Sequence, residues 1–148
     1  MRSVSKRILC AVDFSEASRE ALHVAIDRAR QEPATLLLLH VQEHPLWVNE
    51  PALHLPGDTR KQQLEANEAE LEAWRQEALR RGVPEVTARL VNGVAWDAIV
   101  AAAREDPTIG LVVVATHGRT GLAHALIGSV AERVVRHAPC SVLVVRAA

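Results

Sequence analysis

The residues best suited to chemistry lie near the end of the chain, where a run of valines gives way to a polar loop over 116–127. Gly128 and Ser129 then open a run with helical spacing. A helix start offers free backbone N–H groups and the positive end of the helix dipole, which together attract phosphate. The loop is longer than the usual strand-to-helix connection of about 2–6 residues. It also carries His117 and Arg119, whose side chains suit an anion.

The same segment has a purely structural interpretation. Ser129 and Glu132 have the S-x-x-E spacing of a capping box, in which the serine caps the last helix. Gly118 and Gly128 would then serve only as turn residues. The length and composition of the loop favour anion binding over this interpretation. The chain has neither a G-x-G-x-x-G fingerprint after its first apolar run nor the G-K-[ST] of a P-loop.

Apolar strands and amphipathic helices alternate along the whole chain and must position this loop. Strands are predicted over 7–12, 35–41, 85–91, 109–115 and 141–145, and helices over 16–31, 59–81, 94–105 and 129–137. Ser15 is the predicted N-cap of the first helix, and 42–58 is a long loop with three prolines. The predicted buried stripe of the second helix consists of Leu64, Leu71, Trp74 and Ala78.

This alternation predicts one α/β domain over 1–148, with a five-stranded parallel sheet that is doubly wound and has helices on both faces. Such sheets bind ligands beyond the carboxyl ends of their strands. Asp13, Val41 and the loop over 115–121 all lie at carboxyl ends. We therefore expect them to converge, although Asp13 could instead only cap the first helix.

Bulk composition argues against several classes of function. The chain has 148 residues, of which 49% are hydrophobic and 24% charged, as in globular proteins. A net charge of −1 and the absence of tyrosine give no basis for nucleic-acid binding. No segment is long enough to span a membrane or to form a signal peptide. Cys10 and Cys140 lie in apolar segments and are expected to be reduced and buried in a cytosolic protein. The histidines lack the paired spacing of a zinc site, so no metal site is predicted.

The chain resembles the universal stress protein family along its whole length. The matching segments, in the family's order, are KRILCAVDFSEAS, LLLLHV, VNGVAWDAIVAAA and ATHGRTGLAHALIGSVAERVVRHAPCSVLVVR. The resemblance implies strand order 3-2-1-4-5 and binding of ATP, with Mg²⁺, at the carboxyl ends of the strands. It also implies a homodimer through 141–145. That strand is apolar on both faces, and an exposed apolar edge favours pairing with a second copy.

ATP-binding members of the family carry G-x2-G-x9-G-[ST]. In this chain Ala115 stands in place of the first glycine, and Gly118 and Gly128-Ser129 match the rest. Alanine would cost about 1 kcal/mol or more if its φ were positive, and its methyl group would line the ribose pocket if φ were negative. The resemblance implies a base pocket, nucleoside contacts and a phosphate site made by Ala11, Val12, Asp13, Val41, Ala115, Gly118, Gly128, Ser129 and Val130. His117 and Arg119 are added as phosphate neighbours on their chemistry.

The expected function is that of a cytosolic stress-response protein that binds ATP and acts as a nucleotide-dependent regulator. No residue is placed to position an attacking water, so catalysis is not expected and any hydrolysis should be very slow. Two alternatives stay open. One is a nucleotide-free dimeric interaction module, which Ala115 favours. The other is a slow adenine-nucleotide hydrolase.

Overall fold

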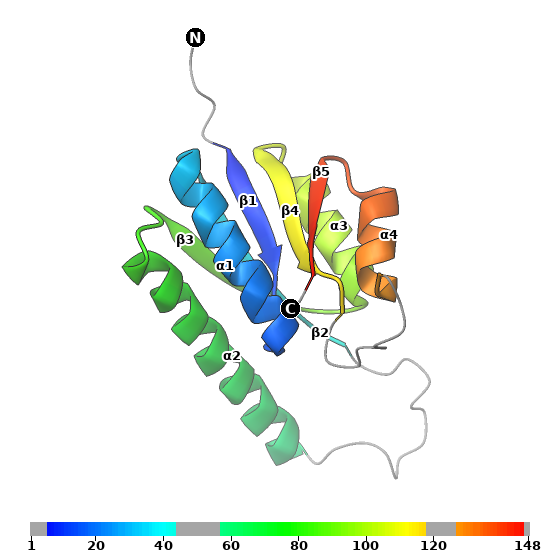
Figure 1. The fold of residues 1–148 in the computed structure, drawn as a ribbon. Helices are drawn as coiled ribbons and strands as arrows, with labels where there is room; N and C mark the ends of the chain where they lie inside the picture. The colour runs from blue at the N-terminus through cyan, green and yellow to red at the C-terminus, as the bar shows by residue number, and fades with distance from the viewer. Residues whose placement is uncertain (1–5, 44–56, 118–126, 147–148) are drawn as a thin grey trace.

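The computed structural model describes residues 6–43, 57–117 and 127–146, which form an alternating series of five strands and four helices (Figure 1). In chain order these are β1 (Arg7–Ala11), α1 (Glu16–Gln31), β2 (Thr35–Gln42), α2 (Gly57–Arg80), β3 (Val86–Asn92), α3 (Ala95–Glu105), β4 (Ile109–Ala115), α4 (Ser129–His137) and β5 (Ser141–Val145). All neighbouring strands are parallel, in the order β3-β2-β1-β4-β5. The predicted fold class and strand order are confirmed.

The sheet lies between two helical layers, with α1 and α2 on one face and α3 and α4 on the other (Figure 1). Alternate residues of the inner strands point to opposite faces, so each face has its own core. On the α1 side, Cys10 and Leu38 pack with helix residues such as Leu22 and Trp74. On the α4 side, strand residues such as Leu9, Leu39 and Val112 pack with residues of α3 and α4. Burial on both faces explains why these strands are apolar without alternation.

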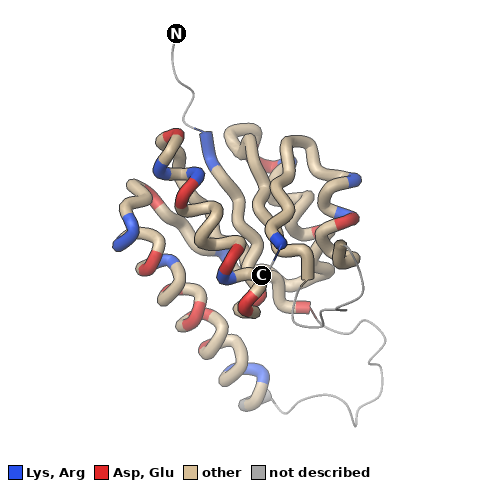
Figure 2. The backbone as a smooth tube through the Cα atoms, in the orientation of Figure 1, with Lys and Arg blue, Asp and Glu red and all other residues tan. Residues whose placement is uncertain are grey.

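The ends of the helices follow local capping chemistry. Ser15 is the N-cap of α1, as predicted, and its hydroxyl accepts a hydrogen bond from the Ser18 amide at 3.1 Å. After α2, Gly82 adopts a φ of +103°, a left-handed conformation that glycine adopts without strain. Its amide donates to Leu79 O at 3.1 Å, which closes the end of the helix. Charges of both signs are interspersed along α1, whereas in α2 acidic residues occupy the middle of the helix and Lys and Arg lie toward its two ends (Figure 2).

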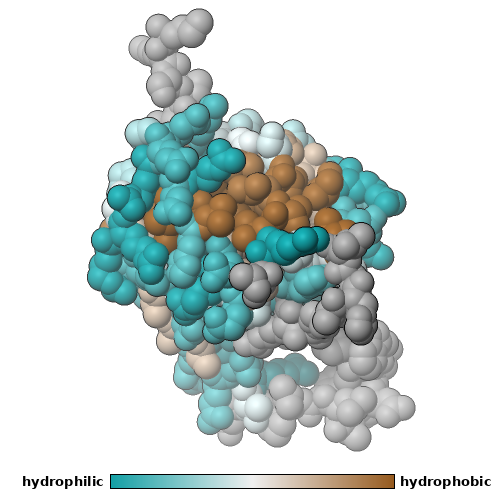
Figure 3. All heavy atoms as spheres, in the orientation of Figure 1, coloured by the Kyte–Doolittle hydropathy of each residue, from teal (hydrophilic) through white to brown (hydrophobic). Residues whose placement is uncertain are grey.

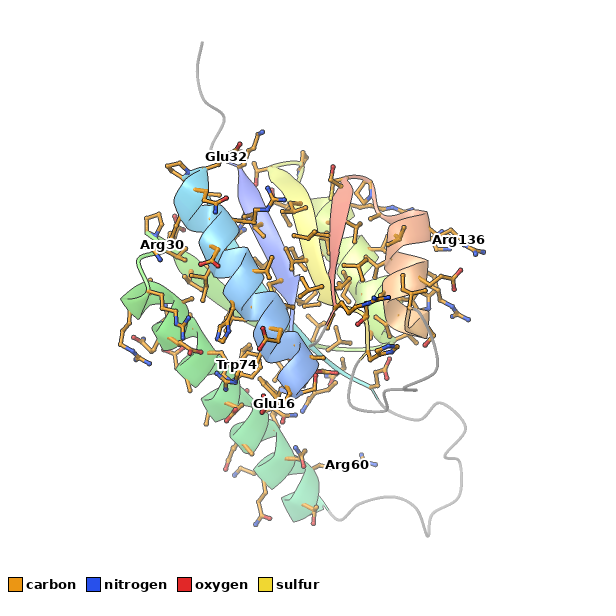
Figure 4. All side chains as sticks on the ribbon, in the orientation of Figure 1. Glu16, Arg30, Glu32, Arg60, Trp74 and Arg136 are labelled. Carbon is orange, nitrogen blue, oxygen red and sulfur yellow. The ribbon has the colours of Figure 1, made fainter. Side chains whose placement is uncertain are left out.

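The prediction for the buried stripe of α2 is wrong at one position. Leu71, Trp74 and Ala78 are buried, but Leu64 is 37% exposed. The reason is geometric: the amino-terminal part of α2 extends past the carboxyl edge of the sheet, whereas its later turns lie against it (Figure 1). Trp74 points from α2 toward α1 (Figure 4), and its indole N–H donates to Glu70 at 3.0 Å.

Cysteine burial is also only partly as predicted. Both thiols are free. Cys10 is fully buried in β1, and burial raises its pKa to about 12, so it stays protonated at neutral pH. Cys140 is only half-buried, because it lies next to the edge strand β5, whose own residues are half-buried or exposed. None of the helices in the described ranges combines the length and apolar character that a membrane span requires.

Candidate functional site

The strand register brings the predicted site segments to one level at the carboxyl edge of the sheet. Ala11 of β1 pairs with Leu39 of β2, so Asp13, two residues after Ala11, lies level with Val41. Cys10 pairs with Val113 of β4, so Asp13, three residues after Cys10, also lies level with Thr116. Two hydrogen bonds of 2.9 Å, from Val12 N to Leu39 O and from Thr116 N to Val145 O, carry the strand pairing past the ends of β1 and β4. Because neighbouring strands lie roughly 4.8 Å apart, these three positions span about 10 Å.

The turn between β1 and α1 is organised by Asp13. Its Oδ1 atom accepts hydrogen bonds from the Ser15 amide at 3.0 Å and from the Ser15 hydroxyl at 2.5 Å. Its own amide donates to the Ser18 hydroxyl at 3.2 Å. Asp13 does not cap α1, whose N-cap is Ser15; it organises the turn before the helix, and the turn holds its carboxylate at the carboxyl edge of β1.

Phe14, which sequence reasoning missed, completes this turn. Among the described non-glycine residues it alone has a positive φ, of 67°, a conformation that costs about 1–2 kcal/mol for residues with a side chain. Its ring stacks on His40 with centroids 4.4 Å apart and meets Trp74 edge-on at 5.4 Å. His40 is buried, with Nδ1 2.8 Å from Val12 O. These contacts hold Phe14 and fasten the turn to the end of β2.

The start of α4 differs from the predicted capping box. Gly128 is the N-cap, without a side-chain cap, and Ser129 is the first helical residue. A capping serine must precede the first helical turn, whereas Ser129 lies inside it. Glu132, the proposed partner in the box, instead forms an ion pair with Arg136. Its amide makes the first helical hydrogen bond, to Gly128 O at 3.0 Å. The three preceding helical N–H groups therefore have no acceptor within the helix.

Gly128 is packed against the end of β4. Its amide donates to Thr116 O at 2.6 Å, and a Cβ atom at this position would lie 2.3 Å from the same oxygen. Its φ of −72° is accessible to any residue, so the demand for glycine is steric rather than conformational. A larger residue would displace α4 from β4 even without a ligand.

Ala115 imposes no backbone strain, because its φ is not among the positive values. It pairs with Val145 of β5, is half-buried, and packs against the core on the α1 side of the sheet. Its methyl group therefore lies on the face opposite α4. The backbone at this position does not require the glycine of the family pattern.

The remaining predicted site residues differ in burial and in the face of the sheet on which they lie. Ala11 and Val41 are half-buried beside the α4-side core, whereas Val12 is buried in the α1-side core. His117 is half-buried, and Ser129 and Val130 are exposed. The predicted contacts Gly118 and Arg119 lie outside the described residues.

Thr116 is a second residue that sequence reasoning missed as part of the site. It is 6% exposed, and its hydroxyl oxygen is buried without a hydrogen-bond partner among the described residues. In sequence it reads only as the first polar residue after a strand. Its significance depends on how β4, β5 and α4 pack around it.

A hollow of about 360 Å³ lies at the opposite, amino-terminal edge of the sheet and is lined in part by Arg7, Arg89, Glu105 and Asp106. These charges pair with one another: Arg7 lies 3.1 Å from Asp106, and Arg89 lies 3.6 Å from Glu105. It therefore offers little uncompensated charge to a ligand. Within the described ranges, no three His, Cys, Asp or Glu side chains are grouped as a metal site would need.

Comparison with known proteins agrees with this geometry. Residues 5–146 match the model of the Universal stress protein family. The chain belongs to the universal stress protein family. It is 35% identical over 144 residues to a universal stress protein of Methanocaldococcus jannaschii, covering 95% of this chain and 82% of that protein. The solved structure of the universal stress protein UspA from Lactobacillus plantarum superimposes with a TM-score of 0.83 at 26% identity, covering 98% and 100% of the two chains. A universal stress protein solved in complex with cAMP has a TM-score of 0.72 at 26% identity, covering 97% and 98%.

The first prediction separates packing from capping at the start of α4. Gly128→Ala should destabilise this universal stress protein by about 1–3 kcal/mol, because the new methyl group overlaps Thr116 O. Ser129→Ala should change stability by less than about 0.5 kcal/mol, because the serine is exposed and does not cap the helix. Urea unfolding of the two variants measures both effects. A loss of about 1 kcal/mol in Ser129→Ala would restore the capping box and contradict our description.

Proposed function

We propose that this universal stress protein binds ATP at the carboxyl edge of its sheet and acts as a nucleotide-dependent regulator in the cytoplasm. The observation that carries the proposal is the start of α4, which has no side-chain cap and is fixed to the end of β4, the strand next to β1, with β2 on the far side of β1. Two free cysteines accord with a reducing compartment.

The phosphate site follows from the helix start. The N–H groups of Ser129, Val130 and Ala131 lack acceptors within the helix and carry the positive end of its dipole. An anion placed there would accept hydrogen bonds from them. Asp13 and Val41 lie on the neighbouring strands at the same level, where the nucleoside would extend. The family member solved with cAMP supports an adenine nucleotide as the ligand class.

The residues present also indicate how Mg²⁺ would be held. Because the described residues contain no carboxylate cluster, the ion would be bound through phosphate oxygens and water, as Mg²⁺ commonly is at nucleotide sites. When bound, it would neutralise phosphate charge. The chain's own contribution is to hold the phosphates with backbone N–H groups and the nucleoside with the ends of β1 and β2.

We further propose that binding occurs without significant chemistry. Oδ1 of Asp13 is engaged by Ser15 in the turn, and His40 is buried with Nδ1 directed at Val12 O. Neither group is arranged to activate a water molecule. The bound nucleotide would instead act through its effect on the protein's surface.

A homodimer through β5 is the second part of the proposal. β5 forms one edge of the sheet. Leu111, Ala115, Leu143 and Val145 are only half-buried on the α1 side, and Figure 3 shows hydrophobic atoms at the surface over β4 and β5 beside α1. Pairing β5 with the same strand of a second copy would satisfy its backbone groups and bury more of this apolar surface. The interaction-module alternative rests on this face.

The nucleotide site is tested by placing a negative charge in the first turn of α4. Val130 is 37% exposed, and Val130→Glu should lower ATP affinity about tenfold, because the carboxylate repels the phosphates and competes for the helix dipole. Val135→Glu is the matched control near the other end of α4, where valine is 50% exposed, and affinity should stay within about twofold of wild type. Calorimetric titration with ATP at physiological ionic strength gives both values.

Two results of this titration would count against the proposal. If the wild-type protein shows no heat and no thermal shift at millimolar ATP, nucleotide binding is wrong and the interaction-module alternative takes its place. If Val130→Glu and Val135→Glu weaken binding equally, the phosphates do not lie at the start of α4.

Turnover provides a separate prediction. Purified protein should hydrolyse ATP well below the usual enzyme range of about 1 per second and above, because neither Asp13 nor His40, among the described residues, is arranged as a general base. Released phosphate is measured in single- and multiple-turnover assays. A faster rate that survives repurification and is lost in Asp13→Ala would establish the hydrolase alternative instead.

The dimer is tested at Leu143, on the half-buried face of β5. Leu143→Lys should convert a wild-type dimer to a monomer, because a charge cannot be buried without a partner in the apolar interface. Val135→Lys, on exposed α4, should leave the dimer unchanged. Light scattering coupled to size exclusion measures mass, and circular dichroism confirms folding. If the wild type is a monomer at tens of micromolar, or if the dimer persists in Leu143→Lys, the proposed dimer through β5 is wrong.

A further inference from the structure

Thr116 has a buried hydroxyl that the protein itself does not satisfy. The residue is 6% exposed, and its Oγ1 atom has no partner among the described residues. Its backbone is held on both sides, since its amide donates to Val145 O at 2.9 Å and its carbonyl accepts from Gly128 N at 2.6 Å. The residue therefore cannot shift to find a partner without breaking the link between β4, β5 and α4.

The position of this hydroxyl relates it to the start of α4. Val112 and Val114 of β4 pack in the α4-side core, and Thr116 is the next residue in this every-second-residue series. Its amide is hydrogen-bonded to Val145 of β5, so the strand geometry continues to this position. Its side chain is therefore expected on the α4 side of the sheet. Ala115, between them, packs on the opposite face. The Thr116 carbonyl accepts a hydrogen bond from Gly128, the N-cap of α4, so the residue adjoins the start of the first turn.

We propose that the Thr116 hydroxyl is a ligand contact that donates a hydrogen bond to a phosphoryl oxygen of the nucleotide bound at the start of α4. This inference rests on the proposed function. An unpaired buried hydroxyl lowers stability, and a hydrogen bond to a charged acceptor is worth more than a neutral one. The ligand-free protein is thus less stable than its valine isostere, and the bound protein recovers the difference.

The test uses Thr116→Val, which removes the hydroxyl and keeps the shape. The ligand-free melting temperature should equal or exceed that of wild type, while ATP affinity should fall about five- to tenfold. Adenosine, which has no phosphate, should bind both proteins within about twofold, which distinguishes a phosphate contact from a sugar contact. A merely structural hydroxyl would give the opposite change in melting temperature.

Thr87→Val is the matched control at the opposite edge of the sheet. The Thr87 hydroxyl accepts a hydrogen bond from the Arg7 guanidinium. Its removal should lower the melting temperature and leave ATP affinity unchanged. Thr116→Ser and Thr116→Ala form a second pair that differs only in the hydroxyl. Ser should bind ATP about five- to tenfold more tightly than Ala, which keeps the test decisive if the valine variant folds poorly.

The outcomes separate this inference from the proposed function. If wild type binds ATP and Thr116→Val binds it equally well, the inference is wrong and the proposed function stands. A lower ligand-free melting temperature in Thr116→Val would show a structural partner for the hydroxyl and also overturn the inference. If adenosine loses affinity as much as ATP, the hydroxyl contacts the nucleoside and not the phosphate. If wild type binds no adenine nucleotide, both proposals fail together.

Discussion

The start of α4 is fixed to the end of β4 by one hydrogen bond, from Gly128 N to Thr116 O, and the geometry of the edge depends on it. The contact is so close that a Cβ atom on residue 128 would lie 2.3 Å from the carbonyl oxygen. Because β4 lies between β1 and the edge strand β5, this bond sets the helix start at the end of an inner strand, next to β1. The first turn of α4, whose N–H groups have no acceptor within the helix, consequently begins next to Thr116, which is level with Asp13 in the strand register.

Most of the fold could be predicted from the sequence because its signals are local. Buried parallel strands appear as unbroken apolar runs, and the bounds of β4, α4 and β5 agree with those predicted from the pattern. The start of α1 could be predicted from Ser15, because N-capping involves residues only three apart in sequence. The strand order came from resemblance to the family, since no local pattern encodes which strands are neighbours. Given that order, the convergence of β1, β2 and β4 at their carboxyl ends follows.

The site was less predictable because its decisive features depend on tertiary contacts. In sequence, Gly128 was only a turn residue or a match to the family pattern, whereas in the structure glycine is required there by the close approach of Thr116 O, twelve residues earlier in the chain. Phe14 takes a positive φ because His40 and Trp74, from two other elements, hold its ring. Leu64 has the spacing of the buried residues of α2, yet it is exposed, because the amino-terminal part of the helix extends past the edge of the sheet. Helical periodicity identifies a face but cannot tell how far the partner surface extends.

The central claim is that phosphate binds to the free N–H groups at the start of α4. The most direct measurement is heteronuclear NMR of the nitrogen-labelled protein with and without ATP, with adenosine as the comparison ligand. Our account predicts that ATP shifts the amide signals of Ser129, Val130 and Ala131 and protects them from exchange, and that adenosine leaves these three nearly unchanged. Saturation by ATP with these amides unaffected, and with shifts centred on Arg7 and Arg89 at the opposite edge, would contradict it.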